Sequence, residues 1–288
     1  MVGTALGALL SEFGHSPISI TRKESDAEKG CIIWDPAKGL KDSSRLETVD
    51  TVVHLAGENI AAGRWTAAVK DRIRRSRIEG TRSLVKSIAS VTRRPKTLVC
   101  ASAIGYYGER GDTILDEDAT AGKGFLADVC REWEHEARAA AELGLRVVNV
   151  RIGVVLSPKG GALAKMLLPF KLGAGGIIGS GRQYWSWIGL HDLVRIILLC
   201  IEQNSIQGAV NAVSPNSMTN YDFTKGVGRA LHRPTLFPLP AFAAKLMLGE
   251  MANELLLSSI RVTPEKLQKQ GFEFHYPELV GCLEHELS

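Results

Sequence analysis

Two adjacent basic residues, Arg22 and Lys23, follow a short apolar run near the start of the chain. In dinucleotide-binding α/β sheets, an acidic residue at this place bonds the ribose hydroxyls of NAD. Arginine and lysine suit the 2′-phosphate of NADP instead. A solvated basic loop is the alternative reading. We take the pair as the main indication of an NADP site.

A longer basic stretch extends from residue 70 to residue 82. Most of its arginines are expected on a solvated helix face. Arg77 is four residues from both Ile73 and Thr81, so the three share one side of a helix. We therefore expect Arg77 to point inward, close to an anionic ligand.

Small residues follow a buried strand at 51–55. Leu55, Ala56 and Gly57 leave room for the backbone to approach a flat ligand. A plain strand-to-loop turn has a similar composition, so this signal is weak by itself.

The chain opens with a helical stretch that is typical of the segment after a phosphate-binding turn. Gly3 matches the last glycine of G-x-x-G-x-x-G, which lets helix and strand pack closely. The preceding strand and glycines are absent from this sequence. We therefore expect a sheet without its first central strand, with Gly3 at the remaining anion-binding helix start.

Short runs rich in Val, Ile and Leu alternate with helical patterns. This rhythm predicts an α/β, Rossmann-like, doubly wound parallel sheet that binds ligands at the carboxyl ends of its strands. The expected strands are 17–20, 30–34, 51–55, 97–101, 145–150 and 208–213, and the expected helices are 66–90, 124–143, 162–172, 191–203 and 219–231.

Prolines at 234, 238 and 240 interrupt this alternation. We expect a nucleotide-binding domain at 1–232 and a small C-terminal α+β subdomain at 233–288. The latter should contain an apolar helix at 241–257, a helix beginning near Pro264 and a short strand at 272–276. About fifty residues rarely hold a core alone, so we expect this part to cap the sheet.

Composition limits the possible partners. The net charge of +4 demands neither nucleic acid nor an acidic membrane surface, and no apolar run is long enough to cross a bilayer. Residues 1–10 are apolar but lack the basic start of a signal peptide. Five scattered cysteines indicate a reducing compartment, the cytoplasm or an organelle interior. No cluster has metal-ligand spacing.

Several motifs together resemble the extended short-chain dehydrogenase/reductase superfamily, and more narrowly its NAD(P)-dependent epimerase-like family with a small C-terminal domain of unknown function. The resemblance covers nearly the whole chain. Its motifs are His54-Leu55-Ala56-Gly57-Glu58-Asn59-Ile60, Arg64-Trp65, Ser76-Arg77-Ile78-Glu79-Gly80-Thr81, Ser102-Ala103-Ile104-Gly105-Tyr106-Tyr107-Gly108, Phe125 to Glu134, Arg151 to Leu156, Met166 to Phe170, Gly179 to Gln183, Trp187 to Asp192, and Gly271 to Leu279.

The resemblance implies that the protein binds NADP. The residues it places at the cofactor are Thr21, Arg22, Leu55, Ala56 and Arg77, to which we add Gly3, Lys23, Gly57 and Arg151. It does not name a substrate, and it leaves the oligomeric state open.

The chain departs from the superfamily at the catalytic helix. The superfamily pairs a Ser or Thr with Tyr-x-x-x-Lys, in which Lys lowers the Tyr pKa and Tyr exchanges a proton with the substrate. Here the Tyr position holds Phe125 or Leu126, and the Lys position holds Cys130. Ser102 or its neighbour Ala103 falls at the Ser/Thr position.

Three substitutes deserve comparison. Tyr221 and Lys225 spell Tyr-x-x-x-Lys, but on a late edge helix, and we interpret them as a chance match. Tyr106 and Tyr107 lie at a strand end on the expected cofactor side, although loop aromatics also pack there. His191-Asp192 is expected to form a helix cap. We therefore predict Ser102 and Tyr107 as catalytic residues.

Two functions remain open. The first is an NADP-dependent oxidoreductase or epimerase-like enzyme acting on a carbonyl or sugar-nucleotide substrate with a non-standard acid. The second is an inactive NADP-binding sensor that acts through a protein partner. A glycine-dense stretch is expected to form either a substrate lid or ordered turns between short helices; it comprises Gly160-Gly161, Gly173–Gly176 and Gly179-Ser180-Gly181.

Overall fold

A four-stranded parallel sheet forms the centre of the molecule, in a computed structural model that describes all residues 1–288. Its strand order is β11-β7-β5-β4. The strands are β4 (Thr51–His54), β5 (Thr97–Ala103), β7 (Arg146–Ile152) and β11 (Gly208–Ala212). The register pairs Val53 with Val99 and Val99 with Val148. Val99 and Val148 are buried, and Val53 partly buried, in a core on one face of the sheet, whereas Val52, Leu98 and Val147 are buried in a core on the other face, as in a sheet covered by helices.

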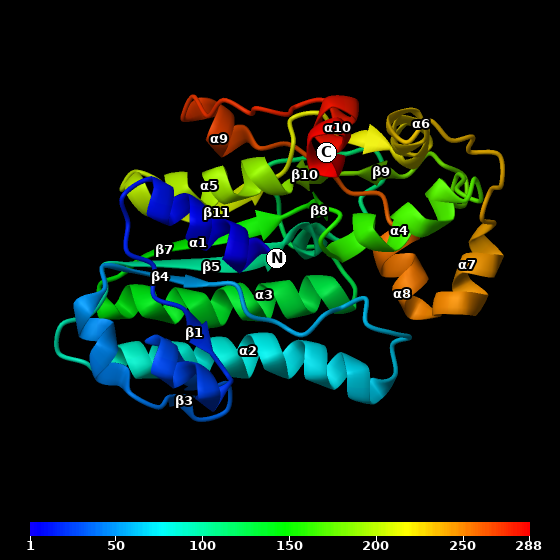
Figure 1. Cartoon of the computed structure of the whole chain (residues 1–288). Helices are drawn as coiled ribbons and strands as arrows, with labels where there is room; N and C mark the ends of the chain where they lie inside the picture. Colours follow the sequence, from blue (N-terminus) through cyan, green and yellow to red (C-terminus); the bar gives the residue numbers. More distant parts are fainter.

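Helices cover both faces of this sheet (Figure 1). On one face lie α2 (Ala67–Ala89) and α3 (Phe125–Arg138), which share a core with β4 and β5. On the other lie α1 (Val2–Glu12) and α5 (Leu190–Glu202), with Leu6 and Leu193 in a second core. The predicted doubly wound α/β fold is confirmed.

A second, smaller sheet lies beside the first. It contains β1 (Ile20–Thr21), β2 (Ile32–Asp35) and β3 (Gly39–Leu40), in that order. β1 pairs only with β2, and β4 pairs only with β5. No strand of the chain is hydrogen-bonded between β1 and β4, so each of them has one unpaired edge.

Shorter elements complete the structure. They are η1 (Glu24–Lys29), η2 (Ser43–Thr48), η3 (Ile104–Tyr107), β6 (Ile114–Leu115), η4 (Ala139–Leu143), β8 (Val154–Leu156), α4 (Gly161–Lys171), β9 (Tyr184–Trp185), β10 (Trp187–Gly189), β12 (Met218–Thr219), α6 (Asn220–Ala230), α7 (Ala241–Leu248), α8 (Glu250–Ala252), η5 (Asn253–Leu257), β13 (Arg261–Val262), α9 (Glu265–Lys269) and α10 (Leu279–Leu287).

The residues from 233 onward have no hydrophobic core of their own. Met251 packs with Trp65, Leu267 joins the core under α5, and Leu283 joins a core with Trp187. This segment therefore spreads over the carboxyl end and one face of the larger part (Figure 1).

Two local predictions for this segment were wrong. Residues 272–276 form no strand, because the N–H groups of His275 and Tyr276 donate to the Asp192 carboxylate instead of to a neighbouring strand. The helix expected at 241–257 is interrupted at Gly249, whose φ of +63° is incompatible with an α-helix.

Candidate functional site

The carboxyl ends of β1, β4, β5 and β7 face the same side of the molecule, where the predicted site residues gather. Parallel strands of an open α/β sheet place ligands at this edge. Around it the chain contributes three groups of side chains: an exposed basic pair, a partly buried arginine behind a strand end, and a buried polar network.

The exposed basic pair is Arg22 and Lys23, directly after β1. Neither side chain forms an ion pair, whereas the neighbouring Lys29 pairs with Asp26 at 3.1 Å. Thr21 is fixed by its own loop, since its Oγ1 donates to Asp26 and accepts the N–H of Lys23, both at 3.2 Å. The loop is thus ordered while its two cationic side chains are free to contact an anion.

Arg77 points inward, as its helical spacing predicts. Its Nη1 donates to the carbonyl oxygens of Glu58 and Ile73, each at 3.1 Å, and the guanidinium stacks over Trp133. Burial lowers the pKa of Arg77. A Cβ at Gly57 would come within 3.1 Å of Arg77 Cζ, so the small residue lets the strand end rest on the guanidinium. No carboxylate pairs with it, which leaves its charge available to an anion.

Leu55 and Ala56 are partly buried and pack against the core between β4 and α2. Gly57, which follows them, is exposed. At the opposite end of the expected cofactor site, Gly3 is exposed in the first turn of α1. Leu55, Ala56 and Gly57 therefore lie at the carboxyl end of β4, where the sequence predicts them.

Ser102 and Arg151 meet at one buried carboxylate. Glu134 of α3 accepts from Ser102 Oγ at 2.7 Å and from Arg151 Nε at 2.8 Å, both on Oε1. Its second oxygen accepts from Arg151 Nη2 at 3.0 Å. All three residues are at most 4% exposed. Although burial alone lowers it, the pKa of Arg151 is raised overall, mainly by the Glu134 carboxylate.

Tyr107 completes this network. Its hydroxyl accepts from Arg151 Nη1 at 2.9 Å and lies within 2.8 Å of two acceptors, Asn211 Oδ1 and the Asp116 carbonyl oxygen. The residue is fully buried, and burial raises the pKa of Tyr107 to about 12. The hydrogen-bonding capacity of the predicted catalytic Ser102 and Tyr107 is thus used inside the protein, and their catalytic roles stay predictions.

The start of α3 carries no phenol or ammonium. Leu126 is 8% exposed in a core with Trp65 and Met251, and Cys130 is 3% exposed. Burial raises the pKa of Cys130 to about 12, so the thiol is neutral near pH 7 and cannot replace a lysine.

A carboxyl group absent from the sequence-based prediction occupies this place. Glu254 of η5 accepts the N–H groups of Phe125 at 3.1 Å and Leu126 at 3.4 Å. A Cβ at Gly124 would lie 2.5 Å from Glu254 Oε1, so glycine is needed for this approach. Burial raises the pKa of Glu254, and its side chain lines a cavity of about 320 Å³ together with Glu109 and Lys123. The sequence signal that could have identified Glu254 is its position as an acidic residue next to the apolar run Leu255-Leu256-Leu257.

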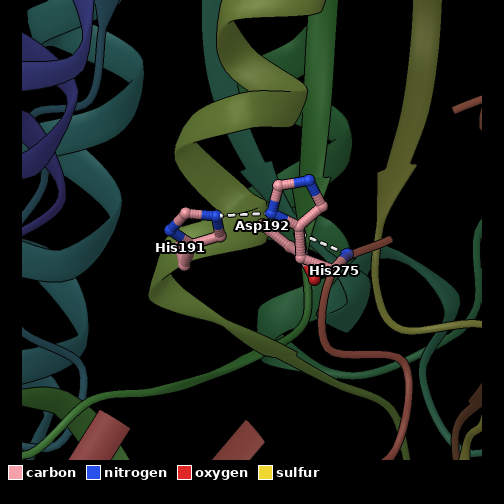
Figure 2. Close-up of side chains that lie close together, drawn as sticks. All are labelled: His191, Asp192 and His275. Carbon is pink, nitrogen blue, oxygen red and sulfur yellow. Dashed lines mark hydrogen bonds between the residues drawn. The ribbon is translucent and has the colours of Figure 1, made fainter. Parts of the chain in front are cut away.

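His191 and Asp192, in the first turn of α5, lie together with His275 (Figure 2). His191 Nε2 and His275 Nδ1 lie 3.0 Å apart and share a hydrogen bond. Both Asp192 oxygens are occupied, by the N–H groups of His275 and Tyr276 and by Arg195 Nη1. The cluster joins the C-terminal segment to the first turn of α5, where Asp192 acts inside the helix rather than as its cap.

Tyr221 and Lys225 are outside the site. They lie on α6, where Lys225 Nζ donates to Thr235 Oγ1 at 2.9 Å and Tyr221 is half exposed. Helix α6 contacts β9, β12 and α10, and not the strand ends described above.

Comparisons with known proteins identify the family. A model of the NAD dependent epimerase/dehydratase family matches residues 1–212, and a domain of unknown function, DUF1731, matches residues 239–286. An epimerase family protein of Mycobacterium tuberculosis is 44% identical over 276 residues, which cover 96% of this chain and 91% of that protein. The human epimerase family protein SDR39U1 is 36% identical over 98% of this chain and 94% of its own length.

Two solved structures are also similar. The crystal structure of human SDR39U1 (isoform 2) with NADPH superposes with a TM-score of 0.89 at 36% identity, covering 99% of this chain and 95% of that one. A nucleoside-diphosphate sugar epimerase from Corynebacterium glutamicum gives 0.82 at 37% identity, covering all of this chain and 56% of that one. On the strand-end motifs, the fold and these matches, the chain belongs to the NAD dependent epimerase/dehydratase family.

Proposed function

We propose that this protein binds NADP(H) across the carboxyl ends of β1, β4 and β5. The carrying observation is a set of three cations without carboxylate partners at this edge: Arg22 and Lys23 in the loop after β1, and Arg77 behind Gly57. Arg22 and Lys23 would hold the 2′-phosphate, and Arg77 would hold the strand-end loop and add positive potential. The NADPH of the human relative's crystal structure supports the same cofactor.

The reaction that fits this site is hydride transfer at a carbonyl or hydroxyl carbon of a small molecule, such as a sugar nucleotide. NADP(H) supplies the hydride when bound. The C. glutamicum neighbour, described as a nucleoside-diphosphate sugar epimerase, supports the substrate class. The chain itself must then supply a proton donor and acceptor next to the start of α3.

Glu254 is the group we propose for that proton exchange. Burial raises the pKa of this carboxyl group, which lines a cavity at the start of α3, so it is a candidate to give and take a proton there. Ser102 and Tyr107 are the alternatives that the sequence predicts, and both are bound into the Arg151 network.

A second function, an NADP(H) sensor without turnover, is favoured by one specific observation. The position of the superfamily's Tyr holds Phe125 or Leu126, and that of its Lys holds the buried Cys130; none of these side chains can replace a phenol or an ammonium. A sensor needs the cofactor site and a partner surface, and it needs no proton donor.

Calorimetry with NADPH and NADH tests the cofactor assignment. Wild type should prefer NADPH, and Arg22→Asp should weaken NADPH binding by roughly 10- to 100-fold, the loss of one charge-assisted contact. Lys86→Asp, which changes an exposed lysine in the last turn of α2, serves as the control. Equal dissociation constants for both cofactors in wild type would overturn the proposal.

NADPH oxidation over a panel of carbonyl compounds and sugar nucleotides separates enzyme from sensor. An enzyme should lose turnover in Glu254→Gln with NADPH affinity retained, and the pH profile should lose its acidic limb. Turnover that survives in Glu254→Gln but disappears in Tyr107→Phe would assign the proton to Tyr107. NADPH binding without oxidation of any compound would favour the sensor.

A further inference from the structure

Seven of the twelve large hydrophobic side chains that remain exposed belong to one lobe of the molecule. Each of the seven is at least 65% exposed, and we call them the apolar face: Leu168, Leu172, Leu236, Phe237, Phe242, Leu246 and Met247. Folded proteins seldom expose such a group of side chains without an interaction that covers it.

Backbone contacts hold the two halves of this face together. Arg233 Nε donates to the carbonyl oxygen of Lys171 at 3.0 Å, and the N–H of Leu239 donates to the carbonyl oxygen of Ile177 at 2.8 Å. The end of α4 is thus tied to the segment that leads into α7. Both helices lie on the right of Figure 1, away from the central sheet.

Helix α7 is apolar on the side that it exposes, which is unusual for a helix within a folded chain. Only Ala244 is buried, whereas Phe242 and Leu246, one turn apart, are 74% and 75% exposed. Lys245 lies between them and is also exposed. No other part of the chain covers this side of the helix.

The charges around the apolar face have a single sign. Residues 143–191 and 223–249 contain no Asp or Glu. Lys171, Arg233 and Lys245 are exposed next to the apolar face and form no ion pair. By contrast, exposed arginines of α2 pair with glutamates of α3. The whole-chain charge of +4 hides this separation, because the acids that balance it lie elsewhere.

We propose that the apolar face binds the surface of an anionic lipid bilayer. Phe and Leu side chains would enter the interface while Lys171, Arg233 and Lys245 contact acidic headgroups, as in interfacial helices that lie in the membrane plane. A second copy of the chain fits less well, since it would bring the same unpaired cations together. None of the helices combines the length and apolar character needed to span a bilayer, so the contact is peripheral.

The sequence predicts no membrane partner, since its whole-chain charge does not demand an acidic membrane surface; the proposal departs from that prediction because of the local surface. It rests on the surface of α4 and α7 alone and is independent of the cofactor proposal. The full chain should cosediment with vesicles of phosphatidylcholine and phosphatidylglycerol, but not with vesicles of pure phosphatidylcholine. About 1 M salt, where the Debye length is about 3 Å, should reduce binding at least tenfold.

Two variants locate the contact. Phe242→Ser/Leu246→Ser removes apolar area, and Lys171→Glu/Lys245→Glu reverses charge; each should weaken binding at least tenfold. The matched controls are Phe13→Ser, which changes another exposed aromatic residue, and Lys86→Glu, which changes an exposed lysine on α2. Circular dichroism melts confirm that each variant is folded.

Three results would overturn the proposal. The first is failure of the wild type to bind phosphatidylglycerol vesicles. The second is equal vesicle binding by the wild type and both double variants. The third is a dimer in light scattering that Phe242→Ser/Leu246→Ser converts to a monomer, which would assign the apolar face to a second copy.

Discussion

Arg151 and Glu134 form a two-pronged ion pair that is almost completely buried, with Nε–Oε1 and Nη2–Oε2 distances of 2.8 and 3.0 Å. The pair links the end of β7 to the middle of α3. Ser102 donates a hydrogen bond to Glu134, and Tyr107 accepts one from Arg151. The two residues predicted to be catalytic are therefore positioned by one charge pair.

Breaking this pair should be costly. Glu134→Gln leaves a buried guanidinium without a countercharge and should lower the free energy of unfolding by about 3–5 kcal/mol, measured by urea denaturation. Glu134→Leu/Arg151→Met removes both charges and should cost less than the single change. A Glu134→Gln protein within about 1 kcal/mol of wild type would show that the pair carries little energy.

Tyr107→Phe separates structure from catalysis. Removing the hydroxyl leaves Asn211 Oδ1 and one Arg151 N–H without a partner, which should lower the free energy of unfolding by about 1–3 kcal/mol. Tyr106→Phe is the control, because it also removes a tyrosine hydroxyl beside Arg151 but keeps the ring that stacks on the guanidinium. Activity assays well below the melting temperature then report on chemistry alone. An unchanged unfolding free energy in Tyr107→Phe would contradict the network described here.

His54 should make the fold sensitive to acid. It is buried against Trp34 and Thr81, and burial lowers the pKa of His54 to about 4, from an ordinary value near 6.5. The unfolded state therefore binds a proton that the native state excludes between these two values. Stability is complete above pH 6.5 and falls as pH drops toward 4, by about 3 kcal/mol in total.

Urea denaturation as a function of pH measures this loss. His54→Gln should flatten the profile between pH 4 and 6.5, whereas His135→Gln, at an exposed position, should keep the wild-type slope. Identical slopes in wild type and His54→Gln would show that other groups cause the acid sensitivity.

Asp192→Asn tests the attachment of the C-terminal segment. The change removes the charge that holds two backbone N–H groups and Arg195, and should lower the unfolding free energy by about 2–3 kcal/mol. The matched control is Asp128→Asn, an exposed first-turn acid with the same i,i+3 arginine, which should cost less than about 1 kcal/mol. Hydrogen exchange at His275 and Tyr276 should quicken only in Asp192→Asn.

The unpaired edges of β1 and β4 predict that an added strand stabilises the fold. Unsatisfied buried backbone groups cost about 1–3 kcal/mol each. A fusion that places an apolar strand and a Gly-x-Thr-Gly turn ahead of Met1 should raise the melting temperature and tighten NADPH binding. The control is the same fusion with prolines in the added strand, because proline has no N–H group to donate to a neighbouring strand. Equal melting temperatures would mean that both edges are already satisfied.

Local pattern predicted the central elements well. Runs of β-branched residues located β4, β5 and β7, and four-residue spacing placed Arg77 inside, because burial of one face dictates both patterns. Glu134 and Glu254 were missed, since their partners are brought to them only by tertiary packing; Glu254 caps a helix 129 residues earlier. The helix expected at 241–257 is interrupted at Gly249, whose φ of +63° no α-helix accommodates; glycine within an otherwise helical pattern was the local signal for this break, and the prediction passed over it.

The hydrogen bonds between the first turn of α5 and the C-terminal segment have a consequence for protein synthesis. Asp192 receives N–H groups from residues 83 and 84 positions later, and Glu286 accepts the N–H of His191 across 95 positions. Chains fold from the N-terminus as they emerge from the ribosome. The first turn of α5 must therefore wait, with a buried carboxylate that lacks these donors, until residues 275–286 have been made. A nascent product that ends before residue 275 lacks these contacts, and proteases should degrade it faster than a chain that includes them.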